Sequence, residues 1–297
     1  MKKQIQVKQT KDKINIKDFL TVQEELSSRR VKQLLKNKQI TLNGKTAYFD
    51  NDVKAGDVVE VDLSETGKDS TVPEEIFIDV IYEDEYFLAV NKPAGMLVHP
   101  TQNFPTGTLS NGVKHYFLSR GVDIPVRLAN RIDRDTSGLV VIAKSGEAHS
   151  ALAAQFELDS CEKYYLAIAE GYFRNCKGSI DKPIGLDEEN TLRRAVREDG
   201  QPSRTEYDVL KQYRDAALVR LKLLTGRTHQ IRVHLKSLGH PLLGDALYEG
   251  SMAIMDRQAL HAHEMVFVHP FDKTVVTLKA PLPKDMEELI EKLEKNS

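Results

Sequence analysis

Two segments of the sequence place charged side chains at the ends of regular elements. In residues 127–144 (RLANRIDRDTSGLVVIAK), a loop with Asp133 and Asp135 runs directly into a continuous apolar strand. A polar loop at the mouth of a buried strand is where a rigid scaffold presents reactive groups. The two carboxylates could bond their own backbone in a turn or bind Mg²⁺ as a pair. The flanking Arg131 and Arg134 favour ion pairing over metal binding.

The second segment, residues 224–245 (LTGRTHQIRVHLKSLGHPLLGD), predicts a helix. Thr228 can cap its start, the helix should run to Leu238, and Gly239 should end it. Arg232 lies on a polar face from which it could hold a carboxylate of a different segment. The expected apolar stripe consists of Ile231, Leu235 and Leu238, and the polar face also carries His229 and Lys236.

The histidines and cysteines do not form a recognisable metal-binding pattern. His229, His234 and His240 lack the spacing of a zinc site and the nearby acidic residue of a metallohydrolase. The two cysteines, Cys161 and Cys176, also lack such a pattern, and we expect them to be free thiols in a cytoplasmic protein. We therefore expect no metal.

The elements that must position these segments indicate an α+β domain. Strands are expected in residues 139–144, 163–173, 203–213 and 217–224, and residues 76–93 should form two strands around an acidic turn. They do not alternate regularly with helices, which argues against a doubly wound parallel sheet. We expect a mixed, largely antiparallel sheet flanked by helices and loops. Residues 90–100 (VNKPAGMLVHP) indicate only a loop, and Tyr164 and Tyr165 are expected in the core.

The N-terminal region has a different character. Residues 17–26 and 29–38 predict two short helices, the second capped by Ser27 or Ser28, and Asn43-Gly44 predicts a tight turn between strands. The expected apolar residues are Phe19, Val22 and Leu26 in the first helix and Val31, Leu34 and Leu35 in the second. Residues 1–49 carry a net charge of +8, so the remainder sums to −10. A polar segment, residues 64–75, is expected to be a linker. The second helix has no acidic residue, and its basic residues include Arg29, Arg30, Lys32 and Lys36.

Composition limits the class of protein. The chain has 297 residues, of which 40% are hydrophobic and 29% charged, as expected for a globular protein with a sizeable core. No apolar run approaches the ~20 residues that span a bilayer, and no secretory signal is recognisable. We expect a monomer with no membrane contact. The basic N-terminal region favours a nucleic-acid partner, although a solvated lysine-rich face is the simpler alternative.

Two family resemblances sharpen these expectations. Residues 14–63 resemble the αL RNA-binding module of the S-four ribosomal-protein type, whose basic helix would meet phosphates. Five motifs resemble, in order, the RluA-type RNA pseudouridine synthases: NKPAG, RIDRDTSGL, KYYLA, TGRTHQIRVH…GHPLLGD and QALHAHEMVFVHP. This resemblance implies the pseudouridine synthase fold over residues 76–297 and the isomerisation of uridine to pseudouridine in RNA, without a cofactor.

The resemblance also assigns roles to individual residues. Asp133 falls on the catalytic aspartate and Arg232 on the basic residue that pairs with it. Tyr165 falls on the aromatic residue that packs against the target base, and Arg131 on the arginine that enters the space left by the flipped nucleotide. Asn130 departs from the family, which usually has histidine there. This change removes a titratable group but leaves an orienting hydrogen bond open.

The sequence is compatible with several alternatives. The chain could be a non-catalytic RNA chaperone of the same fold, which the presence of Asp133, Arg232 and Tyr165 disfavours. It could also be a metal-dependent hydrolase that uses the histidines with Asp133 and Asp135. Among synthases, large-subunit (23S) rRNA is the expected substrate because of the N-terminal module, with tRNA as the alternative. Whether Asp133 attacks the sugar or the base, or abstracts a sugar proton, also stays open.

Overall fold

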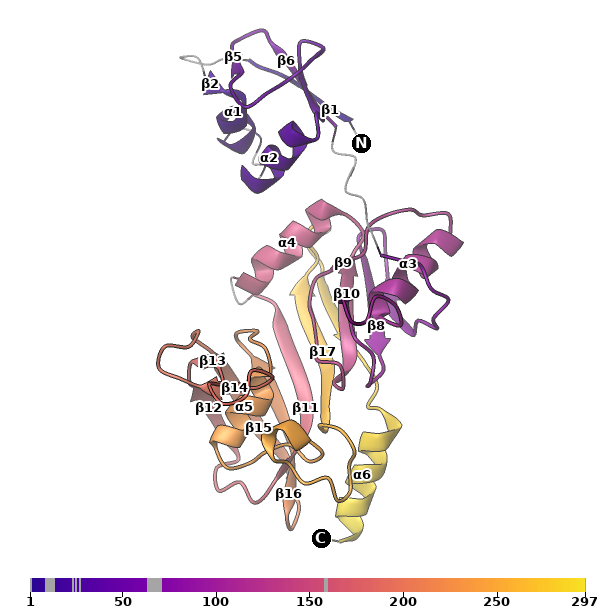
Figure 1. Cartoon of the computed structure of the whole chain (residues 1–297), viewed down its shortest axis with the longest axis vertical. Helices are drawn as coiled ribbons and strands as arrows, with labels where there is room; N and C mark the ends of the chain where they lie inside the picture. The colour runs from indigo at the N-terminus through magenta and orange to yellow at the C-terminus, as the bar shows by residue number, and fades with distance from the viewer. Residues whose placement is uncertain are drawn as a thin grey trace. The chain divides into compact units, whose positions relative to one another are not determined.

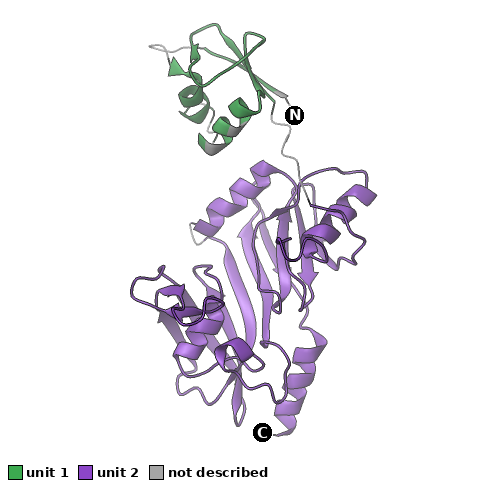
Figure 2. Cartoon of the chain, viewed as in Figure 1, with its two compact units in different colours: residues 1–68 green, residues 69–297 purple. Residues whose placement is uncertain are grey.

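The chain divides into two compact units in the computed structural model, Met1–Lys68 and Asp69–Ser297, which Figure 2 colours separately. The described residues are 2–8, 14–22, 24, 26, 28–62, 71–157 and 160–296. Residues 64–70 of the predicted linker lie outside them, and residues 71–75 form neither helix nor strand. Each unit has its own buried core.

The first unit combines two short helices with small sheets. Its elements are β1 (Lys2–Gln6), β2 (Ile14–Asn15), α1 (Ile16–Val22), α2 (Ser28–Lys36), β3 (Ile40–Leu42), β4 (Lys45–Thr46), β5 (Asp52–Val53) and β6 (Val58–Asp62). They form a four-stranded sheet of order β1-β6-β3-β4 and the pair β2-β5. Asn43 and Gly44 adopt positive φ of 50° and 78°, as the predicted tight turn requires. β1 precedes residue 14, where the predicted module begins.

The two helices bury one face each against this sheet. In α2 the predicted apolar face is confirmed, because Val31, Leu34 and Leu35 are buried. The first helix is shorter than predicted, and of its expected apolar residues Phe19 is buried and Leu26 packs against the core. Its buried residues are Ile16, Phe19 and Leu20, whereas Val22 is 73% exposed. Ser27, one of two candidate caps for α2, lies outside the described residues.

The second unit is built on one large sheet. Its strands are β7 (Val80–Glu83), β8 (Phe87–Lys92), β9 (Arg127–Leu128), β10 (Ser137–Ala143), β11 (Glu162–Glu170), β12 (Lys177–Asp181), β15 (Arg204–Gln212), β16 (Ala216–Leu223), β17 (Leu260–Val268) and β18 (Val275–Lys279). The main order is β12-β15-β16-β11-β17-β10-β8-β7, with β18 beside β17 and β9 beside β10. β10 and β17 pair in parallel, and the other described pairs are antiparallel. The expected mixed, largely antiparallel α+β fold is confirmed.

The remaining elements of this unit are four helices and two smaller features. They are α3 (Leu109–Ser119), α4 (Gly146–Glu157), α5 (Gln230–Ser237), α6 (Lys284–Lys295), the hairpin of β13 (Ile184–Leu186) with β14 (Arg194–Val196), and the 3₁₀ turn η1 (Ala246–Tyr248). Figure 1 shows β11 and β17 running side by side through the middle of the sheet. In the described parts of the chain, every helix is too short or too polar to span a lipid bilayer.

Alternation along the strands explains why helices cover both faces of the sheet. Successive side chains of a strand point to opposite faces. In β8, Phe87 and Ala89 therefore pack in the cluster that contains α4, whereas Leu88 and Val90 pack in the cluster that contains α3. Both faces of this strand are buried, which explains its continuous apolar sequence.

The other half of the sheet repeats this arrangement with different helices. Ala167 and Ala169 of β11 pack in the cluster that contains α5. Ile168, between them, packs on the opposite face with Met286 and Leu289 of α6. The sheet therefore fixes α5, which carries Arg232, on one face of β11.

Gly138 makes the close approach of β10 and β17 feasible. Its φ is +109°, and a Cβ atom there would collide with the carbonyl oxygen of Ala262 on β17. A residue with a side chain would have to move the strands apart or leave this backbone conformation. The glycine of the RIDRDTSGL motif thus sets how the strand after the Asp133 loop joins the sheet.

Candidate active site

The loop that carries Asp133 connects β9 to β10, and Asn130 fixes its start. The side-chain oxygen of Asn130 accepts a hydrogen bond from the backbone N–H of Val141 at 2.8 Å. Its side-chain nitrogen donates to the carbonyl of Leu139 at 3.1 Å. Both polar ends of Asn130 therefore serve strand β10, and the orienting role that the sequence left open is present.

Two basic side chains, Lys92 and Arg257, hold the other end of the same loop. Lys92 is fully buried, and its Nζ atom donates to the carbonyl of Arg134 at 2.8 Å and to two carbonyls of the turn after β8. Burial lowers the pKa of Lys92 to about 7. Arg257 donates to the carbonyl of Asp135 at 3.0 Å. The sequence of the NKPAG motif indicated only a loop. In the structure, its lysine holds the loop that carries Asp133.

Asp133 meets Arg232 across two distant segments. The Nη1 atom of Arg232 lies 3.1 Å from Oδ2 of Asp133. The Asp133 side chain is 24% exposed, and the arginine side chain is 7% exposed. The partner of Asp133 is thus Arg232, and Arg134 of the same loop instead donates to the carbonyl of Gly95 at 3.0 Å. Arg131, also in the loop, is exposed and lines a cavity together with Asp133 and Arg232.

Arg232 has a second partner that the sequence did not reveal. Its Nε and Nη2 atoms each lie 2.7 Å from an oxygen of Asp245, a bidentate pair with a carboxylate that is 1% exposed. Burial alone would lower the pKa of Arg232. The hydrogen bonds and negative charges of Asp245 and Asp133 outweigh burial, so the pKa of Arg232 is raised. Asp245 therefore orients the guanidinium so that its remaining nitrogen faces Asp133.

The start of α5 differs from the predicted one. The helix begins at Gln230 and ends at Ser237, and the residue before it is His229. No side chain caps this end, so the predicted Thr228 cap is wrong. His229 takes a left-handed conformation with φ of 57°. With this backbone turn before the helix, Arg227, Thr228 and His229 line the cavity and do not cap the helix. The predicted glycine stop is confirmed, because Gly239 has φ of +84°.

Tyr164 and Tyr165 are successive residues of β11, so their side chains point to opposite faces of the sheet. The pairing of β11 with β17 shifts at this point, so that Tyr164 faces Glu264 and Tyr165 faces Ala262. Tyr165 lines the cavity and also packs against the core beneath α5. Burial, reinforced by the negative charge of Asp133, raises the pKa of Tyr165. Its phenol is therefore protonated at neutral pH and offers an apolar ring face.

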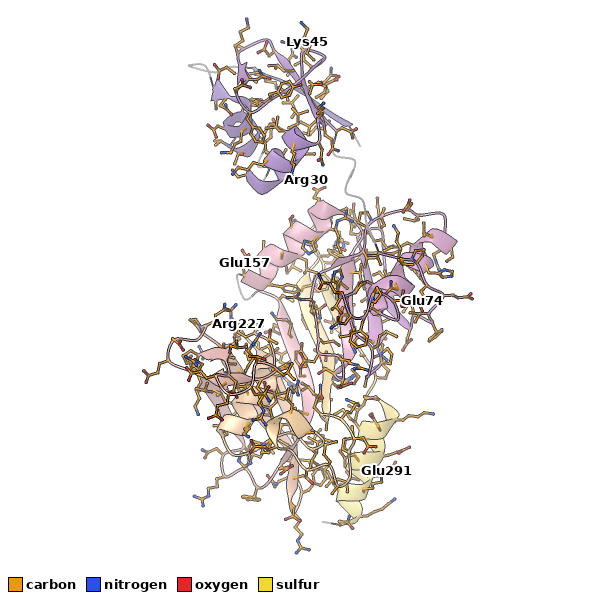
Figure 3. The ribbon with its side chains drawn as sticks, viewed as in Figure 1. Arg30, Lys45, Glu74, Glu157, Arg227 and Glu291 are labelled. Carbon is orange, nitrogen blue, oxygen red and sulfur yellow. The ribbon has the colours of Figure 1, made fainter. Side chains whose placement is uncertain are left out.

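These residues surround a cavity of about 830 Å³. Its lining includes Asn130, Arg131, Asp133, Lys163, Tyr165, Arg227, His229 and Arg232. Figure 3 labels Glu157, at the end of α4, and Arg227, before α5, which line it from two different elements. The volume is within the ~300–1,000 Å³ typical of sites that enclose a small molecule, so a ligand the size of one nucleotide fits. Most of the charged lining residues are basic, which suits a polyanion.

The histidines considered as metal ligands do not converge. His234 is buried against Thr205 at 2.8 Å, and His240 stacks on Phe173 with ring centroids 3.8 Å apart. Only His229 of the three lines the cavity. Within the described residues, no group of three or more histidine, cysteine or acidic side chains is arranged to hold a metal ion.

Sequence comparison identifies the family of the second unit. The family model described as RNA pseudouridylate synthase matches residues 86–237, about half of the chain. A relative from Bacillus subtilis (strain 168), named uncharacterized RNA pseudouridine synthase YhcT, is 42% identical over 87% of this chain and 86% of its own length. A Yersinia pestis relative, named ribosomal large subunit pseudouridine synthase D, is 35% identical over 91% of this chain and 87% of its own length.

Solved structures agree with this assignment at the level of the fold. Human RNA pseudouridylate synthase domain containing 1 superposes with a TM-score of 0.58 at 25% identity, covering 74% of this chain and 96% of that one. Human RNA pseudouridylate synthase domain containing 4 gives 0.60 at 24% identity, covering 73% and 93%. Together with the matches over most of the sequence, these likenesses establish that the chain belongs to the RNA pseudouridine synthases, isomerases that act on uridine in RNA.

Proposed function

We propose that this enzyme isomerises uridine to pseudouridine in large-subunit (23S) rRNA and that Asp133 is its catalytic carboxylate. The observation that carries the assignment of Asp133 is its 3.1 Å contact with Arg232 at a cavity large enough for one nucleotide. A carboxylate must be ionised to act as a nucleophile or base, and an adjacent cation favours the ionised form. Arg232 supplies that cation.

The other roles follow from the reaction. The C1′–N1 bond breaks, the uracil turns, and C5 bonds to C1′. A uridine within structured RNA must first leave its stack, which is favoured by an apolar surface that receives the base. The ring of Tyr165 supplies that surface, and Arg131, exposed at the cavity, would enter the space that the nucleotide leaves. Asn130 would act on the substrate indirectly, by holding the loop.

The substrate assignment has two supports. The Yersinia pestis relative is named for the large ribosomal subunit. The first unit, proposed as an αL RNA-binding module, presents Lys32 and Lys36 on the exposed side of α2. Arg30 belongs to the same helix and is labelled in Figure 3, whereas the side chain of Arg29 lies outside the described residues. A basic helix of this kind would bind phosphates and add affinity that is independent of sequence.

The same proposal covers the remaining properties of the enzyme. It would act without metal or cofactor, as a monomer, in the cytoplasm where ribosomal RNA is modified. Turnover should therefore persist in excess chelator, whereas a hydrolase that used Asp133 and Asp135 to bind a metal would lose activity.

Mapping of pseudouridines in total RNA tests the proposed substrate. RNA from cells that contain the protein is compared with RNA from cells that lack it, and with RNA from cells that carry only Asp133→Asn. We expect specific sites in large-subunit rRNA to be lost in the second and third samples. Loss confined to tRNA sites would leave the chemistry intact but overturn the rRNA substrate, and unchanged RNA would overturn both.

A further inference from the structure

His229 occupies a strained position at the cavity, and the proposed roles do not use it. Its φ of 57° is unusual for a residue with a bulky side chain, so its surroundings must hold it there. The side chain is 17% exposed and lines the cavity. Its Nε2 atom lies 3.9 Å from Oδ2 of Asp133, which is too far for a direct hydrogen bond.

A chain of hydrogen bonds determines which ring nitrogen of His229 carries the proton. The backbone N–H of Arg194 donates to the hydroxyl oxygen of Tyr248 at 2.8 Å. Nδ1 of His229, 2.8 Å from the same oxygen, is the acceptor among the described contacts of this hydroxyl, so we assign the Tyr248 proton to it. A neutral imidazole has one donor and one acceptor nitrogen. Because Nδ1 accepts, Nε2 carries the proton and faces the cavity beside Asp133.

The charges around His229 favour this neutral form. Burial lowers the pKa of His229, the attraction of Asp133 opposes that change, and the guanidinium of Arg232 reinforces it. Asp245 and Arg194 act more weakly, in opposite directions. The imidazole is therefore neutral at neutral pH, and in the described part of the chain no hydrogen bond engages its Nε2–H.

Packing keeps Tyr248 in place for this purpose. The tyrosine is 3% exposed, and its ring meets the His229 ring edge to face at 5.6 Å. The guanidinium carbon of Arg232 lies over the same ring at 4.8 Å from its centre. His229, Tyr248 and Arg232 therefore pack together on the side of the cavity that faces Asp133.

We propose that His229 is a second catalytic residue, whose Nε2–H donates a hydrogen bond to a carbonyl oxygen of the flipped uracil. The inference rests on the proposed function of the Asp133 cavity. When the C1′–N1 bond breaks, its electron pair stays with the uracil and spreads over the carbonyl oxygens. The pair is used again when C5 bonds to C1′, after which C5 loses a proton and N1 gains one. A fixed donor stabilises that transient negative charge. Tyr248 is a positioning residue that fixes the tautomer.

A pair of His229 variants separates the donor from the backbone. Asparagine tolerates the left-handed conformation but is too short to place a donor at the Nε2 position. Glutamine can place its amide N–H near that position. In single turnover with RNA, His229→Asn should be slower by about 10²-fold, the loss typical of one missing donor to a developing oxyanion. His229→Gln should retain more activity, and His240→Asn, away from the cavity, should match wild type.

Tyr248→Phe tests the positioning role without touching the substrate. It should lower the single-turnover rate with little change in RNA affinity. The ¹⁵N signals of the His229 ring should also shift from a single tautomer towards a mixture. An unchanged tautomer with an unchanged rate would overturn the role of Tyr248. This variant also provides a test should His229→Asn fail to fold.

Thio-substituted substrates decide whether the donor meets the base. Two RNA substrates carry 2-thiouridine or 4-thiouridine at the target position, so that sulfur replaces one of the two carbonyl oxygens. Sulfur accepts hydrogen bonds weakly. Wild type should therefore react slowly with the substrate in which sulfur replaces the oxygen that His229 contacts. That penalty should disappear in His229→Asn. Equal penalties in both proteins, or a wild-type rate in His229→Asn, would overturn this inference while leaving Asp133 in its role. Absence of pseudouridine from the wild-type reaction would instead overturn the proposed function as well.

Discussion

The two carboxylates on Arg232 predict that its loss has two separable consequences. Arg232→Met leaves Asp245, which is 1% exposed, without its bidentate partner. Removing one partner of a buried ion pair typically costs about 3–5 kcal/mol. For a unit of this size about 2–4 °C of Tm is lost per kcal/mol, so the unfolding temperature should fall by about 6–20 °C. The same change removes the cation beside Asp133, so activity should fall too.

A second substitution separates these effects. Asp245→Asn keeps the shape of the side chain but removes the charge that Arg232→Met leaves unpaired. The double variant should therefore recover much of the lost Tm. It should not recover activity, because Asp133 still lacks its cation. Lys236→Met, one turn further along α5, is the matched control, since Lys236 pairs with Glu249 at the surface and should matter little.

The assay is a pH–rate profile in single turnover, paired with thermal unfolding of each variant. Loss of the cation disfavours the ionised form of Asp133. The activity of Arg232→Met and of the double variant should therefore be lowest at low pH and recover partly as pH rises. Arg232→Lys should retain part of the activity, because one ammonium group cannot serve both carboxylates as the guanidinium does. If the double variant recovers activity together with stability, Arg232 is purely structural and the proposed pairing is wrong.

Three further predictions concern the scaffold. Lys92→Met leaves three carbonyls of partly buried hydrogen bonds without their donor and should lower the unfolding temperature by several degrees, because an unmet group costs up to about 1–3 kcal/mol where water cannot reach it. An unchanged melting curve would contradict this. Gly138→Ala should reduce stability and turnover together, because the added Cβ meets the Ala262 carbonyl; wild-type behaviour in both would show that the strands separate freely. Deleting residues 1–68 should leave a folded catalytic unit whose RNA binding depends less on salt, by roughly 0.7–0.9 in log–log slope for each lost phosphate contact; an unchanged slope would remove the first unit from the RNA interface.

The fold was predictable to the extent that it depends on local pattern. Apolar alternation placed β8, β10, β11, β15 and β16 near their observed positions, because burial of strand faces imposes that pattern. The error at Val22 arose because helical spacing alone does not determine which face of a short helix meets the core. The error at Thr228 arose because the chain enters α5 through a left-handed His229, which no capping rule anticipates.

The site was predictable only where a motif pointed to it. Asp133, Arg232 and Tyr165 came from the family resemblance, and the structure brings them to one cavity. Asp245 was part of the GHPLLGD motif, but nothing in the sequence indicated that it faces Arg232. Lys92 lies 42 residues before the carbonyl that it holds. Contacts of this kind depend on how the sheet folds, so sequence spacing does not reveal them.

Release of tritium from rRNA labelled at C5 of uridine tests the central claim most directly, because C5 loses its hydrogen only when the base has turned and bonded to the sugar. We expect wild type and Asp135→Asn to release tritium, since the side chain of Asp135 has no contact with Arg232 among the described residues. Asp133→Asn keeps the size and polarity of the side chain but cannot ionise, so it should fold, bind RNA and release none. Normal release by Asp133→Asn would contradict the assignment of Asp133 as the catalytic carboxylate.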